Sequence, residues 1–197
     1  MGGAIFNHLY QRREFELALI DPKIDKIWES LSKSSKVKSP LGNMASPHTA
    51  WMLTRSLETL SIRMERQCSN AQEVVQFLID HPQVERVFYP GLESQGERQN
   101  EIYRKQCSAP GAMISFDVRG GEKEAFTVLN NLKLVKLAVS LGSNESLAQH
   151  PYHMTHADMP DEEKEALGLT DQMVRLSVGI EDPQDLIADL RQALDQL

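Results

Sequence analysis

The sequence predicts an α+β domain in which helices cover one face of a β-sheet. Three observations carry this prediction: a long apolar stripe at helical spacing over residues 46–82, short segments of alternating apolar residues over 83–178, and an amphipathic helix that closes the chain. At 197 residues the chain is long enough for one substantial domain, or for one domain with a docking appendage.

Two helices are expected before the first strand. Asp21 and Pro22 form a start signal for a short amphipathic helix that reaches Leu31. Ser46 and Pro47 start a second helix, which we expect to run unbroken to about residue 81. Its stripe consists of Leu53, Leu57, Leu60, Met64, Cys68, Ala71, Val75 and Leu78. A stripe of this length needs a large partner surface, which is either the core of the domain or a subunit interface.

Strand and helix patterns then alternate. Strands are expected over Val84–Tyr89, over Ala112–Val118 and over Leu132–Ser140, with a helix over Glu122–Asn130. In the third of these strands Val135, Leu137 and Val139 would share one side. Residues 141–172 are polar and irregular, apart from a brief helix over 161–167. A connection of this length is more often functional than idle.

The last strand carries the most informative residue. In Met173–Val178 the residues Val174, Leu176 and Val178 lie on one face, so Arg175 points to the other. Asp182 then caps a closing helix with Pro183 in its first turn. An arginine in the middle of an apolar strand is either an ion-paired surface residue or a planar donor that can bind a carboxylate bidentately.

Composition excludes several classes of function. The net charge of −7 and the lack of a basic stripe argue against nucleic-acid binding. No apolar run approaches the ~20 residues that span a bilayer, and no signal pattern opens the chain, so we expect no membrane segment and a cytoplasmic protein. Cys68 and Cys107 are interpreted as free thiols. His150, His153 and His156 lack the carboxylate or cysteine partners of a metal site, so hydrogen-bonded imidazoles anchoring a loop are the preferred interpretation.

Several motifs together resemble one enzyme family. These are Gly42–Pro47 with Trp51 and Arg63–Arg66, then Pro110–Phe116, Ser140–Leu147, His150–Pro151 with Met154–His156, and Arg175–Asp182. Their order and spacing resemble the Cys/Met-metabolism family of pyridoxal-phosphate (PLP) enzymes, which includes methionine γ-lyase, cystathionine γ-lyase and cystathionine γ-synthase. The resemblance covers nearly the whole chain. It implies the C-terminal small domain of a fold-type I PLP enzyme over residues 83–197, a long linking helix over 46–82 and a remnant of the large cofactor domain over 1–45.

The resemblance also implies roles for named residues. By position, Arg175 would bind the α-carboxylate of a sulfur amino acid, and Ser140 would lie beside both the cofactor and that carboxylate. The resemblance also implies that Val139 and Leu141, on either side of Ser140, would line the same substrate pocket. Val139 stands where cystathionine γ-lyases tend to carry an acidic residue, so the chain is more similar to the methionine γ-lyases.

The family's Schiff-base lysine precedes a glycine-containing stretch that Met1–Ala4 resembles. We therefore expect no catalytic residue within this chain and a transsulfuration-type lyase fragment that is incomplete as a catalyst alone, because Lys23 and Lys26 are poor substitutes. Association into a homo-oligomer or with a complete paralogue is expected. The alternative is a non-catalytic interaction module that associates with a complete paralogue or a separate front half.

Overall fold

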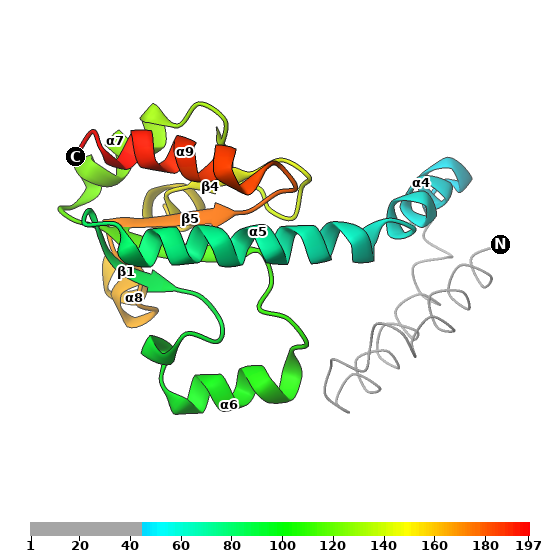
Figure 1. Cartoon of the computed structure of the whole chain (residues 1–197), viewed down its shortest axis with the longest axis horizontal. Helices are drawn as coiled ribbons and strands as arrows, with labels where there is room; N and C mark the ends of the chain where they lie inside the picture. Colours follow the sequence, from blue (N-terminus) through cyan, green and yellow to red (C-terminus); the bar gives the residue numbers. More distant parts are fainter. Residues whose placement is uncertain (1–44) are drawn as a thin grey trace. The chain divides into compact units, whose positions relative to one another are not determined.

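The computed structural model describes residues 45–197, and the predicted helix over 21–31 lies outside them. The chain divides into two compact units. One comprises residues 1–60 and 101–108, and the other comprises 61–100 and 109–197. The second unit contains the sheet and most of the helices, and Figure 1 follows its chain from teal to red. This unit positions the candidate site.

The predicted long helix is two helices. Helix α4 spans Pro47–Leu57 and helix α5 spans Leu60–Asp80, with a turn at residues 58–59 between them. Ser46 caps α4 as predicted, since its Oγ accepts from the Thr49 N–H at 3.1 Å. At the other end the Glu58 N–H donates to the carbonyl of Arg55, three residues back, which tightens the last turn. No residue of α4 is buried.

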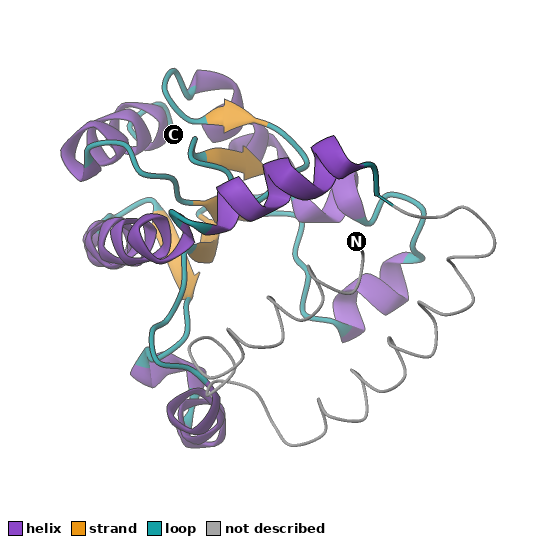
Figure 2. Cartoon of the chain, turned by 90° about the vertical axis from the view of Figure 1, so that its right-hand side faces the viewer, coloured by secondary structure: helices purple, strands orange, loops and turns teal. Residues whose placement is uncertain are grey.

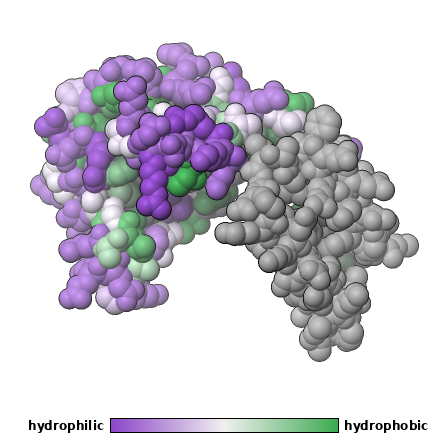
Figure 3. All heavy atoms as spheres, turned by 90° about the horizontal axis from the view of Figure 1, so that it is seen from below, coloured by the Kyte–Doolittle hydropathy of each residue, from purple (hydrophilic) through white to green (hydrophobic). Residues whose placement is uncertain are grey.

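The apolar stripe is buried only in its second half. Ala71, Val75 and Leu78 belong to the core, whereas Leu53 is 60% exposed and Met64 is 38% exposed. Over the face drawn in Figure 3, apolar side chains lie among hydrophilic ones. In the described chain, exposed large apolar residues of α4 and early α5 are Trp51, Met52, Leu53, Ile62 and Met64. The core alternative therefore holds for the second half of the stripe, and the first half is not part of the core.

Five strands form one sheet in the order β1-β2-β5-β4-β3. Figure 2 draws strands in orange and helices in purple. They are β1 (Val84–Phe88), β2 (Met113–Val118), β3 (Lys136–Leu137), β4 (Leu147–Gln149) and β5 (Met173–Ser177). The pairs β1–β2, β2–β5 and β4–β5 are antiparallel, and β3–β4 is parallel. The sheet is thus centred on β5, the strand that carries Arg175.

One face of this sheet is apolar and packs against helices. Ile114, Phe116, Val174, Leu176 and Ala148 alternate along β2, β5 and β4 and belong to the core. The same core takes buried residues from α5, from α7 (Glu122–Asn131) and from α9 (Pro183–Leu194). Figure 1 shows α5 and α9 running beside β5. We call this side the apolar face, and the opposite side, which carries Ser115, Asp117, Arg175, Ser177 and Gln149, the polar face.

The predicted strand over 132–140 shrinks to two residues. Asp189 on α9 accounts for its late start, because its carboxylate accepts the backbone N–H groups of Lys133, Leu134 and Val135 at 2.8, 2.9 and 2.9 Å. These groups are then not available to a strand ladder. Val135 is buried as expected, but Leu137 and Val139 are 47% and 54% exposed, so the three do not share one buried side.

Two elements lacked a sequence signal. Strand β4 is buried at all three positions, so it shows no alternation. Helix α6 (Glu97–Gln106) buries only Asn100 and carries no apolar period. The remaining elements are the 3-10 turn η1 (Glu93–Gln95), the π-helical turn η2 (Pro151–Thr155) and the short helix α8 (Asp161–Ala166), which was predicted.

Candidate functional site

Arg175 lies in the middle of a row that crosses the polar face. The strand registers pair Phe88 with Ser115, Ser115 with Arg175, and Arg175 with Gln149. Directly paired residues of neighbouring strands project to the same side of a sheet. The prediction that Arg175 points away from the apolar side chains of β5 is therefore confirmed, and the structure adds the neighbours that the sequence could not name.

The guanidinium of Arg175 is held by neutral oxygens. Its Nη2 donates to the carbonyl of Ser140 at 3.2 Å. The amide oxygen of Gln149, when turned toward it, lies 3.0 Å from Nη1 and 3.2 Å from both Nη2 and Nε. The reverse amide orientation would turn an NH2 group toward these donors, so the hydrogen-bond network assigns the first. Half-burial lowers the pKa of Arg175 through desolvation, yet the group stays charged because the ordinary pKa of arginine lies far above neutral pH.

No carboxylate of residues 45–197 forms an ion pair with Arg175. Elsewhere on the polar face the situation is different, since Arg86 donates to Asp117 at 3.0 and 2.8 Å. Within the described chain, Arg175 is therefore not an ion-paired surface residue, which was the first of its two predicted roles. Its positive charge is available to an external anion.

The turn after Ser140 is fastened to the sheet and to α5. The Gly142 N–H donates to Ser177 Oγ at 2.9 Å, and Gly142 adopts a φ of +73°, which favours glycine. Gln67 on α5 donates to the carbonyl of Ser143 at 2.7 Å. These bonds keep the Ser140 carbonyl beside Arg175.

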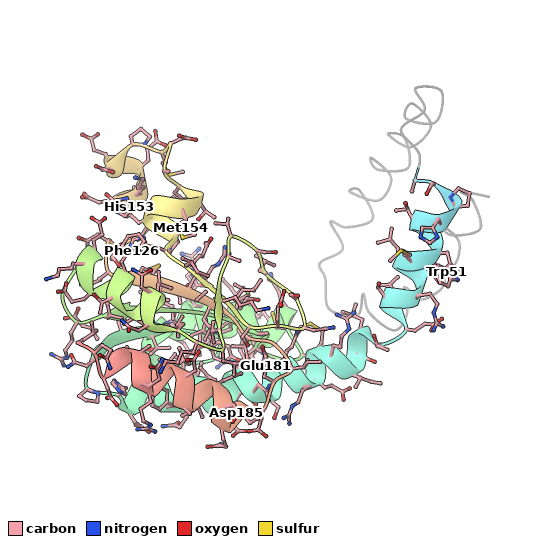
Figure 4. All side chains as sticks on the ribbon, turned by 90° about the horizontal axis from the view of Figure 1, so that it is seen from above. Trp51, Phe126, His153, Met154, Glu181 and Asp185 are labelled. Carbon is pink, nitrogen blue, oxygen red and sulfur yellow. The ribbon has the colours of Figure 1, made fainter. Side chains whose placement is uncertain are left out.

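The far end of this turn is held by the carboxylate of Glu181. Glu181 (Figure 4) accepts from the Ser146 N–H at 2.6 Å and from the Ser146 hydroxyl at 2.9 Å. The Gly179 N–H donates to the same hydroxyl oxygen at 2.8 Å. A side chain at Gly179 would collide with the carbonyl oxygen of Asn144, so only glycine permits this approach. Glu181 therefore locks the end of β5 to the turn.

The predicted site residues do not all converge. Ser140 is exposed and reaches Arg175 through its backbone carbonyl. Val139 and Leu141 are 54% and 57% exposed on either side of it. Sequence reasoning missed Gln149 and Glu181, which hold Arg175 and the turn. Gln149 stands in an unpatterned Leu–Ala–Gln stretch that offered no signal, whereas Glu181 lay within a recognised motif.

The histidines behave as anchors of the irregular segment. His150 is fully buried and stacks on Phe126 at 4.8 Å between ring centroids; Figure 4 shows Phe126 near His153. Its Nε2 donates to the carbonyl of Asp171 at 2.7 Å, while its Nδ1 accepts from the His153 N–H at 3.3 Å. Burial lowers the pKa of His150, chiefly through desolvation. Residues 45–197 contain no cluster of three or more potential metal ligands.

No helix in the described part of the chain is long and apolar enough to cross a bilayer. Cys68 and Cys107 are free thiols as predicted.

Comparison with known proteins gives a consistent result. Residues 22–195 match the family model of the Cys/Met metabolism PLP-dependent enzymes. The chain is 51% identical over 161 residues to an L-methionine gamma-lyase of Fusobacterium nucleatum subsp. polymorphum, covering 82% of this chain and 40% of that protein. It is 47% identical over 158 residues to the cystathionine gamma-lyase of Bos taurus, covering 80% and 38% of the two chains. The chain thus spans about two fifths of the length of these relatives.

Solved structures agree with the sequence relatives. A cystathionine gamma-lyase of Micromonospora echinospora superposes with a TM-score of 0.76 at 39% identity, over 81% of this chain and 41% of that one. An O-acetylhomoserine (thiol)-lyase of Campylobacter jejuni, solved with a pyridoxyl-lysine phosphate, gives a TM-score of 0.74 at 36% identity, over 79% and 37% of the two chains. With sequence and structure in agreement, this chain belongs to the family of Cys/Met metabolism PLP-dependent enzymes.

Proposed function

We propose that this chain is the substrate-carboxylate-binding part of a PLP-dependent carbon–sulfur lyase that resembles methionine γ-lyase. The intact enzyme would eliminate the γ-substituent of a sulfur amino acid and yield a thiol, a 2-oxo acid and ammonia. The observation that carries this proposal is the guanidinium of Arg175, which is oriented by neutral oxygens and has no ion-pair partner among residues 45–197.

The geometry around Arg175 suits an α-carboxylate. A guanidinium offers a planar fork of donors, and a carboxylate matches this fork with two parallel hydrogen bonds. The half-buried position removes part of the competing water, which strengthens such a pair. In the proposed role Arg175 orients the substrate, and the exposed hydroxyl of Ser140 adds a donor at the edge of the same subsite.

The polar face suits an acid group beside the cofactor rather than the cofactor itself. Pyridoxal phosphate presents a multiply charged phosphate and an aromatic ring, whereas this face offers the guanidinium of Arg175, which has no ion-pair partner among residues 45–197. We infer that Ser140 lies next to the cofactor, and that its phosphate and ring are held by a fold-type I large domain. The bound cofactor supplies the electron sink of the reaction. The residues of this chain bind the carboxylate and hold its orientation.

The similar proteins include both methionine γ-lyases and cystathionine γ-lyases. This supports a γ-lyase reaction, while the preferred sulfur amino acid depends on the substrate pocket. Methionine and cystathionine γ-lyases match at 51% and 47% identity. We infer the methionine type from Val139, which is exposed beside Ser140 and offers an apolar side chain rather than a charge. An apolar wall suits a methylthio group better than the amino acid end of cystathionine.

The test is the replacement of Arg175 in a full-length enzyme that carries this sequence. Arg175→Leu should lower kcat/KM for L-methionine at least about a hundredfold, since losing charge-assisted hydrogen bonds costs about 3 kcal/mol. Arg175→Lys should retain part of the activity, and Arg191→Leu, on an exposed part of α9, serves as the control. Unchanged turnover in Arg175→Leu would contradict the proposal.

A second candidate is a non-catalytic interaction module. It is favoured by the exposed apolar residues of α4 and early α5, among which Trp51, Leu53 and Ile62 are 59%, 60% and 66% exposed. Such residues would then be covered by a complete paralogue or a separately encoded front half. Sedimentation of the chain alone and with the paralogue tests this candidate, which predicts self-association or capture by the paralogue. A stable monomer that does not bind the paralogue would count against it.

A further inference from the structure

Gln149 is the most completely buried polar contact of Arg175. Its side chain is 1% exposed, at the end of β4, and the register places it directly opposite Arg175. Its amide oxygen lies 3.0 to 3.2 Å from Nε and both Nη atoms, over the face of the planar guanidinium. Buried amides of this kind are retained only when their partners satisfy them, so the contact is built into the fold.

The amide also contacts the segment behind it. Thr155 Oγ lies 3.2 Å from the same amide oxygen, while its hydroxyl donates to the carbonyl of Pro151 at 3.1 Å. Nδ1 of His156 lies 3.0 Å from the Thr155 hydroxyl oxygen and 2.9 Å from the same carbonyl. These contacts hold Thr155 beside the amide of Gln149. The neighbouring His150, buried against Phe126, fixes the backbone from which Gln149 projects.

We propose that Gln149 is a positioning residue whose neutral amide oxygen aims the guanidinium of Arg175 without discharging it. This inference rests on the proposed carboxylate-binding function. A carboxylate at this position would form a buried ion pair and cancel the charge that a substrate needs. An apolar side chain would leave the guanidinium free to rotate, so binding a substrate would have to order it. Glutamine alone among the three orients Arg175 and keeps its charge.

The chemistry of the ligand follows from this arrangement. A guanidinium that is fixed and uncompensated favours an anionic carboxylate over a neutral amide or alcohol in the same place. Gln149 would thus set discrimination between amino acids and their carboxyl-blocked derivatives. A residue that merely supported the fold would lower the affinity for both.

The first experiment needs no catalysis and uses the 197-residue chain. NMR of the Arg175 Nε–H group should show a resolved resonance with slow rotation about Nε–Cζ. The signal should broaden or merge with exposed arginines in Gln149→Met, which has a similar length and no amide oxygen. Free rotation of Arg175 in the unaltered chain would overturn the inference directly.

The second experiment is kinetic, in a full-length enzyme that carries this sequence. Gln149→Met should raise KM for L-methionine about tenfold, the effect of losing one polar contact to a charged group. Gln149→Glu should raise it about a hundredfold, because the new carboxylate competes for Arg175. Both variants should leave KM for L-methioninamide within about twofold. Gln192→Met is the matched control, since Gln192 on α9 donates to the Asn131 carbonyl at 2.6 Å, away from this face.

Two outcomes separate this inference from the function on which it rests. If Arg175→Leu raises KM for L-methionine and Gln149→Glu binds it no worse than Gln149→Met, the role of Gln149 is wrong and the function stands. If Arg175→Leu leaves KM unchanged, both the function and the role of Gln149 are wrong.

Discussion

The two faces of strand β5 differ in how their residues are held. On the apolar face, Leu176 is 2% exposed and packs into a core shared with α5, α7 and α9. On the polar face, Arg175 is half-buried and is held by two named oxygens. Nonpolar contacts are non-directional, so the first face tolerates repacking, while hydrogen bonds impose a geometry on the second. The apolar face therefore contributes most of the stability, and the polar face fixes the orientation of Arg175.

The largest contrast is expected between two neighbours on β5. Leu176→Ala should lower the free energy of unfolding by about 2 to 5 kcal/mol, because it empties a buried position. Arg175→Leu should change it by about 1 kcal/mol, because the guanidinium is partly solvated. Urea denaturation of the chain measures both. Equal losses would show that the two faces contribute alike to stability.

The boundary between the faces is tested at Gly179. Gly179→Ala should cost about 1 to 3 kcal/mol, because the added methyl meets the Asn144 carbonyl and the Glu181 carboxylate. Gly121→Ala is the matched control, since its nearest contact would be an ordinary 3.6 Å to Asp171 Oδ2. Thermal unfolding of the two variants compares them. A harmless Gly179→Ala would mean that the turn beside Arg175 is not held tightly.

The stability that His150 contributes should decrease at acidic pH. Folding lowers the pKa of His150, so the unfolded chain binds the proton more readily than the folded chain. The stability is therefore fully present above the unfolded pKa of about 6.5 and is lost as pH falls toward the folded pKa, by up to about 1.4 kcal/mol per pH unit.

Replacing the histidine isolates this effect. His150 faces His153, Glu122 and Asp171, whose charges modify its titration. His81 is shifted in the same direction by burial. His150→Gln should flatten the dependence of unfolding free energy on pH below 6.5 by the share of one group. An unaltered pH dependence would indicate that His150 does not titrate differently on folding.

The smallest effect concerns the helix caps. Asp182 accepts from the Gln184 N–H at 2.9 Å and caps α9, which packs on the apolar face. Asp182→Ala should cost about 1 kcal/mol of global stability. Ser46→Ala removes a similar cap from α4, which buries no residue, and should reduce helix content with little change in the unfolding midpoint. Similar midpoint shifts in both would contradict the division between packed and unpacked helices.

Sequence patterns predicted the elements whose signals are local. Ile114, Phe116 and Val118 alternate and lie in the core as expected, and Asp182 with Pro183 starts the closing helix where predicted. Strand β5 and the outward direction of Arg175 followed from the same two-residue period. Each of these signals is contained within about ten residues, so no knowledge of distant partners was needed.

Other features of the fold depend on residues that are far apart in the sequence. Asp189, more than fifty residues away in the chain, takes the N–H groups that would have lengthened β3. No residue of α4 is buried, and the predicted long helix is interrupted at residues 58–59.

The sequence by itself determined the strand that carries Arg175, the helix caps at Ser46 and Asp182, and the family resemblance. Residue periodicity and motif order can be recognised without knowing the tertiary structure. Only the tertiary structure decided that Gln149 and the Ser140 carbonyl meet the guanidinium, and that no carboxylate of residues 45–197 pairs with it. Hydrogen bonds between strands depend on register, and register is set by the whole sheet rather than by any one segment.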